Sequence, residues 1–216
     1  HNCAIISIKK AFPLHANKAM YALWGLGQMM YTKMLIIVDE SVNVHDYQAV
    51  LEAMVIHANA KSHYVVTEGP LDALDHASNR AFQGYRLGID ATQKLPLEHS
   101  ASLPLKAVDL STSVHILPIS QAKEDMPLHS YRYIILVDDD VPVDNYSTVS
   151  WKVFNNIDAN RDISYKNRDD GTICLIIDAT KKGEKDGLLR PWPDDIKMSE
   201  TIQSLVTEKW NTYGIK

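Results

Sequence analysis

The chain has 216 residues, of which 45% are hydrophobic and 23% charged, a balance that predicts a globular fold with a buried core. Its net charge of −5, with lysine and arginine scattered along the sequence, argues against a dedicated nucleic-acid-binding protein. The two cysteines, Cys3 and Cys174, show no spacing typical of a disulfide framework or a zinc site, so we expect a cytoplasmic location.

The sequence shows no pattern typical of a membrane span or a targeting signal. No apolar run reaches the roughly 18 residues that a membrane span needs, and no signal-peptide pattern opens the sequence. The chain begins directly on a strand-like run at residues 4–8, without an initiator methionine. We therefore expect a fragment whose N-terminal portion is missing.

The first part of the chain predicts alternating strands and helices. Residues 3–8 have the pattern of a strand, and residues 13–30 that of a helix with a broad apolar face. Residues 34–38 form a continuous apolar run, as in a parallel strand that is buried on both faces. An acidic turn at residues 39–43 follows, and residues 47–55 show helical spacing again.

A loop and a linker come next. Residues 63–67 predict a short strand, residues 68–87 a long loop, and residues 88–92 a short β-like piece. Residues 93–112 are rich in serine, leucine and proline and are predicted to form a linker.

The pattern of strand, acidic turn and helix start occurs twice. After a predicted strand at residues 114–119, the stretch YIILVDDDVPVDNYSTVS (133–150) is similar to MLIIVDESVNVHDYQAVL (34–51). Residues 36–60 align without gaps on residues 135–159, with eight identities where unrelated segments would share about two. The identical pairs are Ile36/Ile135, Val38/Val137, Asp39/Asp138, Val42/Val141, Val44/Val143, Tyr47/Tyr146, Val50/Val149 and Ala60/Ala159.

A later motif is also repeated. GIDAT at residues 88–92 is echoed by IIDAT at residues 176–180, so the second copy lacks about eleven residues of the long loop. It also lacks a clear counterpart of the first helix. We interpret the pattern as an internal duplication; the alternative is that any two βα units look similar.

These elements predict an α/β fold, with a mostly parallel sheet flanked by helices, an internal βα repeat and an extended C-terminal helix. We predict a first α/β unit at residues 1–99, a second, degenerate copy at 100–186, and a C-terminal docking helix at 187–216. Ser199 is the expected N-cap of that helix. Its apolar stripe must dock on its own domain or on a neighbouring subunit. The stripe consists of Ile202, Leu205, Val206 and Trp210.

One acidic cluster is a candidate metal site. Asp138, Asp139 and Asp140 follow a buried strand and look like the DxD motif of nucleotide-sugar transferases, in which carboxylates hold Mg²⁺ or Mn²⁺. The first copy has Asp39–Glu40–Ser41 at this place, so the triplet is not kept between the copies. The alternative is that the carboxylates stabilise the positive end of the following helix.

The remaining motifs identify no catalytic constellation. Asp72, Asp75 and His76 could make a hydrogen-bonded site, or they could cap and order the long loop. The sequence has no nucleophile elbow, no phosphate-binding loop and no dinucleotide-binding glycine motif. Its nine histidines include no HxH or HExxH pair.

Several segments together resemble the C-terminal domain of the UbiD carboxy-lyases, which include the 3-octaprenyl-4-hydroxybenzoate decarboxylases. The segments are HANKAMYALWGLGQMMYTK, VDESVNVHD, EGPLDALDHAS, GIDATQK and the C-terminal RPWPDDIKMSETIQSLVTEKWNTYGI. The resemblance covers about residues 1–99 and 187–215. The second copy lies between these two parts and is therefore interpreted as an insertion. We expect it to have a structural role, because it lacks the long loop.

The resemblance implies a non-oxidative decarboxylase of aromatic or α,β-unsaturated acids. Such enzymes use prenylated flavin mononucleotide (prenylated FMN), a divalent metal, usually Mn²⁺, and a monovalent cation. The family's catalytic residues and metal ligands belong to the preceding domain, so we assign no catalytic, cofactor-binding or metal-binding residue to this chain. By itself it should be inactive and carry no cofactor. The implied partners are its own N-terminal flavin-binding domain and further copies in a homo-oligomer, and the family's best-known pathway is quinone biosynthesis.

By the same resemblance, two places match segments that line the substrate cavity of relatives. One is Tyr31–Thr32 and the other is Pro70–Leu71. The lysine that some relatives carry a few residues before the first place is Gln28 here, a departure from the family pattern.

Two other functions stay open. One is a structural assembly module without catalysis. The other is a Mn²⁺- or Mg²⁺-dependent nucleotide-sugar transferase built around residues 138–140.

Overall fold

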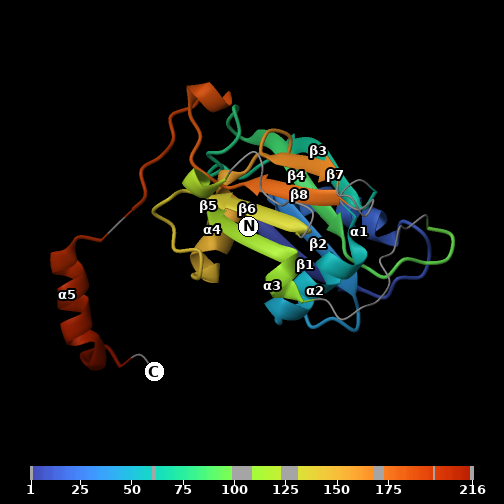
Figure 1. Cartoon of the computed structure of the whole chain (residues 1–216), viewed down its shortest axis with the longest axis horizontal. Helices are drawn as coiled ribbons and strands as arrows, with labels where there is room; N and C mark the ends of the chain where they lie inside the picture. Colours follow the sequence, from blue (N-terminus) through green and yellow to red (C-terminus); the bar gives the residue numbers. More distant parts are fainter. Residues whose placement is uncertain are drawn as a thin grey trace.

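Two four-stranded sheets form the body of the molecule (Figure 1). Their strand orders, β1-β2-β4-β3 and β5-β6-β8-β7, are equivalent, and each sheet has two parallel pairings and one antiparallel pairing. The predicted α/β fold with an internal βα repeat is therefore confirmed. The computed structural model describes residues 2–59, 62–98, 109–122, 131–167, 173–196 and 198–214. Ala60 and residues 99–108 of the predicted linker lie outside these ranges.

The first sheet and its helices follow the predicted order. The elements are β1 (Cys3–Ile8), α1 (His15–Trp24), the 3-10 helix η1 (Gly27–Tyr31), β2 (Met34–Asp39), α2 (Tyr47–His57), β3 (Tyr64–Pro70) and β4 (Gln83–Asp90). Residues 34–38 of β2 are all buried. This burial is what a continuous apolar run predicts for a central parallel strand.

Helix α1 covers the outer face of the first sheet. We expected a helix at residues 13–30, but α1 ends at Trp24 and Gly25 follows as its C-cap. Glycine favours such an end because it costs a helix interior about 1 kcal/mol relative to alanine. Three buried side chains at helical spacing pack on the sheet: Ala16, Met20 and Trp24.

The antiparallel pairing of β3 with β4 shortens the predicted long loop. We expected a loop at residues 68–87, whereas the two strands pair over much of that range and leave residues 71–82 as the loop. Gly69 and Gly84 lie in the paired ends. Glycine has low β propensity, so the sequence pattern is weak where these strands begin and end.

The second sheet repeats this arrangement of strands and helices. Its elements are α3 (Leu110–Ser113), β5 (Val114–Pro118), η2 (Ile119–Gln121), β6 (Tyr133–Val137), α4 (Tyr146–Asn156), β7 (Ile163–Asn167), β8 (Ile173–Asp178) and η4 (Glu184–Asp186). Residues 109–122 and 131–167 contain no counterpart of α1.

The two sheets share one hydrophobic core, to which α2 and α4 contribute. In Figure 1 the second sheet, coloured yellow to orange, overlies the first, coloured blue to green. Both helices begin at an equivalent cap. The Asp46 carboxylate accepts hydrogen bonds from the N–H groups of Gln48 and Ala49, and the Asn145 side chain accepts one from Thr148. These caps satisfy N–H groups that the first helical turn leaves free.

A pair of tyrosines joins the sheets inside the core. Tyr64 Oη donates to Tyr133 Oη at 2.6 Å, and Tyr133 Oη donates to the Met54 carbonyl of α2 at 3.3 Å. Burial raises the pKa of Tyr133 to about 12 and that of Tyr64 well above its usual range, so both hydroxyls remain protonated donors.

Replacing Tyr64 by phenylalanine should lower the free energy of unfolding by about 1–2 kcal/mol, because the buried Tyr133 hydroxyl loses a partner. Tyr165→Phe is the matched control, since Tyr165 is 46% exposed. Its loss should stay below about 0.5 kcal/mol. Urea unfolding measures both variants, and equal losses would show that the tyrosine pair does not stabilise the contact between the sheets.

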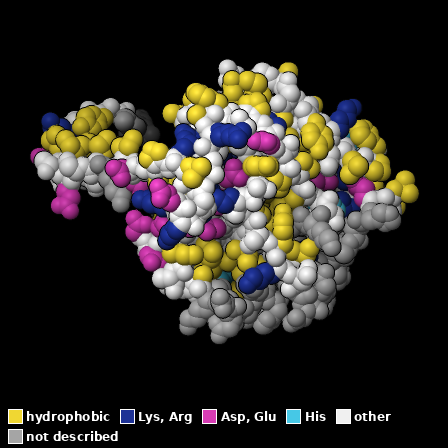
Figure 2. Space-filling model, turned by 90° about the horizontal axis from the view of Figure 1, so that it is seen from above, with side chains coloured by type: hydrophobic (Ala, Val, Ile, Leu, Met, Phe, Trp, Pro, Cys, Tyr) yellow, Lys and Arg dark blue, Asp and Glu magenta, His cyan; other side chains and the backbone are white. Residues whose placement is uncertain are grey.

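Helix α5 (Glu200–Lys209), followed by η5 (Trp210–Thr212), lies apart from the body (Figure 1). The Ser199 hydroxyl accepts a hydrogen bond from the Ile202 N–H, as the predicted N-cap requires. No residue of α5 is buried, and Figure 2 shows hydrophobic side chains gathered on this helix at the left. The described residues therefore do not cover its apolar stripe.

Candidate functional site

The four predicted cavity-lining residues lie in two neighbouring segments. Tyr31 ends η1 and is half-buried, and Thr32 follows it with 2% exposure. Pro70 ends β3 and is exposed, whereas Leu71 begins the loop and is 1% exposed. Two of the four side chains are thus buried within this chain.

Arg86 of β4 connects these two segments. Its guanidinium donates to the Met30 carbonyl in η1 at 3.1 Å and to the Glu68 carbonyl in β3 at 3.5 Å. The side chain is buried, and a Cβ at position 69 would collide with the guanidinium, so Gly69 leaves the space that Arg86 fills. Arg86 also lies 4.8 Å from the ring centroid of Trp24, a cation–π contact.

Trp24 holds the same segment from the other side. Its indole Nε1–H donates to the Thr32 carbonyl at 2.9 Å, a buried hydrogen bond. The stacked Trp24 and Arg86 side chains therefore fix two carbonyls of residues 30–32. This backbone is held by side-chain donors as well as by its own 3-10 hydrogen bonds.

A buried ion pair joins the first segment to the loop. Lys33 Nζ contacts the Asp75 carboxylate, and both side chains are nearly fully buried. Lys33 also donates to the Asn155 carbonyl in α4 at 3.3 Å, and Asp75 Oδ1 accepts from Ser78 Oγ and N–H. Burial alone would raise the pKa of Asp75, but the Lys33 ammonium and the Ser78 donors hold it below its usual value.

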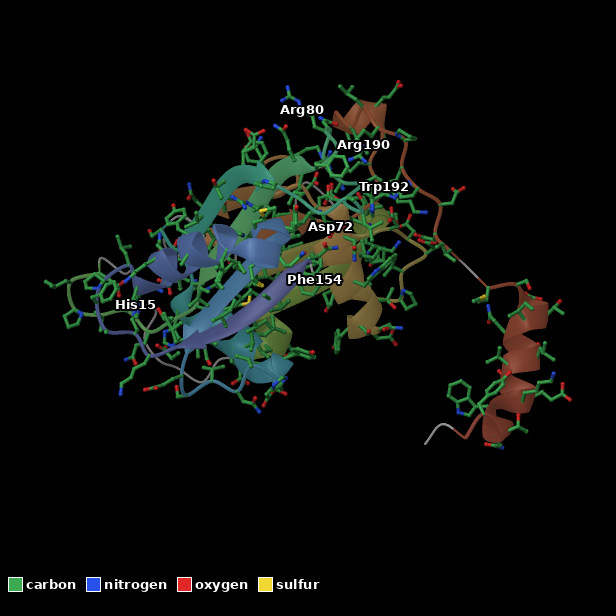
Figure 3. All side chains as sticks on the ribbon, turned by 180° about the vertical axis from the view of Figure 1, so that it is seen from behind. His15, Asp72, Arg80, Phe154, Arg190 and Trp192 are labelled. Carbon is green, nitrogen blue, oxygen red and sulfur yellow. The ribbon has the colours of Figure 1, made fainter. Side chains whose placement is uncertain are left out.

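The loop itself is ordered by its own acidic residues and by the chain after β8. Asp72 Oδ1 accepts from the Leu74 N–H, an Asx turn that the sequence suggests. Arg190 donates to the Asp75 carbonyl at 3.0 Å, and the Trp192 ring stands at right angles to that of His76. In Figure 3 Arg190 and Trp192 lie on the same side of the molecule as Asp72.

The repeated acidic turns connect neighbouring strand ends. Asp39 Oδ2 accepts from the Gln93 N–H at 2.6 Å, and Asp138 accepts from the Lys181 N–H at 3.1 Å, the equivalent bond in the second sheet. Asp139 Oδ1 accepts from the Ser120 N–H. These carboxylates thus have structural partners, which favours the helix-start and turn role over a DxD metal site.

The repeated DAT motif forms the same turn twice. Asp90 Oδ1 accepts from the N–H and hydroxyl of Thr92 and lies 3.0 Å from Lys94 Nζ. Asp178 makes the same contacts to Thr180 and Lys182, with the same 3.0 Å ion pair. The duplicated sequence therefore forms the same hydrogen-bonded turn at the ends of β4 and β8.

His63, which lies near the Asp90–Lys94 turn, should make the stability of the fold depend on pH. Burial and then the Lys94 ammonium lower the pKa of half-buried His63 to about 4, from 6.5. Between these values the unfolded chain binds the proton that the folded chain excludes, so stability falls as pH decreases from 6.5 toward 4. After allowance for solvent screening the loss should be about 1–2 kcal/mol.

The test is chemical denaturation of wild type and His63→Gln at several pH values. The variant does not titrate in this range and should lose that part of the slope. An unchanged slope in His63→Gln would contradict the assignment to His63.

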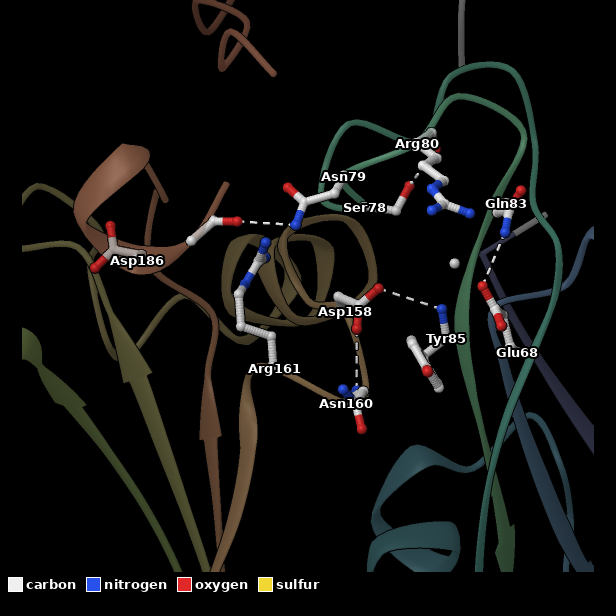
Figure 4. A pocket seen from close by; sticks show the side chains of 12 residues that line it. Glu68, Ser78, Asn79, Arg80, Gln83, Tyr85, Asp158, Asn160, Arg161 and Asp186 are labelled. Atoms are coloured by element: carbon white, nitrogen blue, oxygen red, sulfur yellow. Dashed lines mark hydrogen bonds between the residues drawn. The ribbon is translucent and has the colours of Figure 1, made fainter. Parts of the chain in front are cut away.

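A cavity of about 310 Å³, formed mostly by residues of polar and charged types, lies between the loops of the two sheets (Figure 4). None of the four predicted residues lines it. Sequence reasoning missed this cavity because its walls come from parts of the chain about 80 residues apart, without a local motif. The lining residues are Glu68, Ser78, Asn79, Arg80, Gln83, Gly84, Tyr85, Asp158, Asn160, Arg161, Asp186 and Gly187.

Metal sites and membrane spans are not found in the described part of the chain. Residues 2–59, 62–98, 109–122, 131–167, 173–196 and 198–214 include no group of three or more His, Cys, Asp or Glu side chains that could hold a metal ion. Within the same residues, no helix is long and apolar enough to cross a bilayer. A Mn²⁺ ion therefore does not fit the described residues of this chain.

Comparison with known families gives a clear result. The family model "3-octaprenyl-4-hydroxybenzoate carboxy-lyase C-terminal domain" matches residues 1–91 and 116–180, more than two thirds of the chain. The chain therefore belongs to this UbiD C-terminal domain family. The match includes most of the segment that we predicted to be an inserted second copy, so that segment also carries the family pattern.

Full-length relatives are much longer than this chain. An uncharacterized protein of Helicobacter pylori (strain ATCC 700392 / 26695) is 32% identical over 236 residues, which cover 95% of this chain and 37% of that protein. An uncharacterized protein of Archaeoglobus fulgidus is 43% identical over 95 residues, 44% of this chain and 20% of that protein. The chain thus spans little more than a third of the first of these relatives.

Solved structures with partial similarity include a vanillic acid decarboxylase and a UbiD-class enzyme. The vanillic acid decarboxylase of Sedimentibacter hydroxybenzoicus in open form is 26% identical, with a TM-score of 0.45, over 50% of this chain and 24% of that chain. The UbiD-class enzyme HmfF from Pelotomaculum thermopropionicum in complex with FMN is 28% identical, with a TM-score of 0.40, over 50% of this chain and 25% of that chain.

Proposed function

We propose that this chain is the C-terminal part of a longer UbiD-like carboxy-lyase that decarboxylates an aromatic or unsaturated acid. The family match carries the proposal. When bound to the preceding domain, prenylated FMN supplies the chemistry that removes the carboxyl group. That domain also holds Mn²⁺ and the catalytic residues. A polyprenyl-hydroxybenzoate of quinone biosynthesis is one substrate of the right class.

In this proposal the chain supplies part of the wall of the substrate cavity. The Tyr31–Thr32 and Pro70–Leu71 segments form that wall. The contacts of Arg86 and of the buried pair Lys33–Asp75 support this role, since they hold the two segments in a fixed relation. A rigid wall excludes water and orients a substrate, which lowers the entropic part of a barrier.

The chain also serves assembly in this proposal. The apolar stripe of α5 docks on the flavin-binding domain or on another copy of the protein, since the described residues of its own chain leave it exposed. A helix of this length needs such packing for stability.

The test is CO₂ release by the full-length protein loaded with prenylated FMN and Mn²⁺, over a panel of small and large aromatic and unsaturated acids. Leu71→Ala should change the ratio of kcat/KM between a large and a small substrate by about fivefold or more, because the Pro70–Leu71 segment of the wall can then move into the buried space that the leucine side chain leaves. Leu74→Ala is the matched control, since Leu74 is 87% exposed in the same loop. The ratio does not depend on the folded fraction, so an unchanged ratio in Leu71→Ala would contradict the lining role.

A further inference from the structure

Charged side chains of both signs, from both copies of the repeat, line the cavity. Arg80 projects from the loop between β3 and β4, and Asp158 from the turn after α4, as Figure 4 shows. Both copies of the repeat therefore contribute to it. Cavities between packed units are common places for small-molecule sites, and about 310 Å³ is at the lower end of their usual range.

Asp158 is a buried carboxylate without a close ion-pair partner among the described residues; the Arg161 charge acts on it only at longer range. Asp158 is 8% exposed, and its oxygens accept hydrogen bonds from the backbone N–H groups of Asn160 at 3.0 Å and Tyr85 at 3.2 Å. No Lys, Arg or His side chain of the described residues lies within 4.0 Å of it. Burial raises the pKa of Asp158, and its backbone hydrogen bonds and the Arg161 charge offset this rise only in part.

Arg80 is the free cation of the cavity. Its side chain makes no hydrogen bond or ion pair with any residue that the structure describes. Arg161 also lines the cavity, but its guanidinium is engaged by both oxygens of Asp162, each at 2.7 Å. An unengaged guanidinium is a strong, bidentate site for a carboxylate.

The other two carboxylates of the lining are less buried than Asp158, since Glu68 is exposed and Asp186 half-buried, so water can solvate both. Glu68 Oε1 accepts from the Gln83 side chain at 2.8 Å, and Asp186 Oδ2 accepts from the Gly183 N–H at 2.9 Å. No group of three metal-ligating side chains occurs here or elsewhere in the described residues, which argues against a metal ion as the missing cation. A protonated amine, by contrast, can pair with a single carboxylate.

We propose that this cavity binds a small zwitterion of the amino-acid class, with its carboxylate on Arg80 and its ammonium on Asp158. A molecule with both charges compensates both side chains at once, whereas a simple acid or amine leaves one of them unpaired. The cavity adjoins the Pro70–Leu71 segment, since Gln83 of its lining pairs with Pro70, but none of the four predicted wall residues lines it, and the inference does not depend on the proposed decarboxylation.

The experiment is calorimetric titration of the full-length protein with α- and ω-amino acids of increasing chain length. For each, the amine alone and the acid alone at the same chain length are the comparison ligands. At least one amino acid should bind saturably, and its single-charge analogues should bind about tenfold more weakly or worse. Equal binding of an analogue, or no saturable binding up to about 10 mM of any amino acid, would overturn the proposal.

Two variants assign the binding to the cavity. Arg80→Gln and Asp158→Asn should each weaken binding about tenfold or more. Lys166→Gln, which removes an exposed charge on β7, is the matched control and should bind as wild type does. Arg80 is exposed, so its variant tests the site even if Asp158→Asn does not fold. Wild-type affinity in Arg80→Gln would overturn the proposal.

Discussion

Replacing Lys33 by methionine is expected to lower the free energy of unfolding by about 3–5 kcal/mol, the largest stability effect that we predict. The variant keeps the length and apolar stem of the side chain but leaves the buried Asp75 carboxylate without its cation. Urea unfolding at neutral pH measures the loss. The contribution of Asp75 is present above its ordinary pKa of 3.8 and is lost as pH falls through its lower folded value.

Lys181→Met is the control for this prediction. Lys181 Nζ lies 3.5 Å from an Asp195 oxygen, but its side chain is 42% exposed. Surface pairs of this kind contribute about 0–1 kcal/mol. If Lys33→Met costs no more than Lys181→Met, the buried pair is not what fixes the loop to the strand.

Arg86→Met should lower kcat/KM of the proposed full-length decarboxylase by about tenfold to a hundredfold, the largest effect on activity that we predict. The methionine fills much of the space beside Trp24 but cannot donate to the Met30 and Glu68 carbonyls. The two segments of the proposed cavity wall then move relative to each other. Arg86 acts here as a positioning residue, because we place no contact between it and the reacting atoms.

Arg86→Lys separates charge from geometry. The lysine keeps the positive charge, but an ammonium lacks the planar fork that reaches one carbonyl in η1 and one in β3. We expect an activity between those of wild type and Arg86→Met. A purely structural role would instead lower the melting temperature while kcat/KM of the folded fraction stays within about twofold of wild type, and that result would contradict the positioning role.

The sequence predicts the parts of this fold that depend on local pattern. The apolar run of residues 34–38 identifies a buried parallel strand, and Ser199 identifies the start of α5. The gap-free repeat identifies the second sheet, because duplicated core positions impose the same strand, turn and helix. In each case a single segment contains the whole signal.

The parts that were missed depend on contacts between distant segments. Glycine-containing strand ends hid the β3–β4 pairing, since what stabilises them is the partner strand. Lys33, Asp75 and Arg86 have no motif, and their importance follows only from burial and from partners far along the chain. The cavity with Asp158 requires the packing of one sheet on the other, which no local pattern specifies.

The duplication now has a physical explanation. Each copy contains an acidic turn. The first aspartate of that turn, Asp39 or Asp138, accepts a hydrogen bond from the backbone N–H of the residue after the DAT motif. The two resulting sheets bury their inner faces against each other in one core. Because the second sheet carries α4, it also supplies Asn155, which receives the Lys33 ammonium beside the proposed cavity wall.

The most direct test of our account compares CO₂ release by the full-length protein and by residues 1–216 alone, each incubated with prenylated FMN, Mn²⁺ and a panel of aromatic and unsaturated acids. We predict release from at least one acid by the full-length protein, and neither release nor retained flavin with residues 1–216. Decarboxylation by residues 1–216 alone, or a cofactor-loaded full-length protein that is inactive on every acid of the panel, would contradict it.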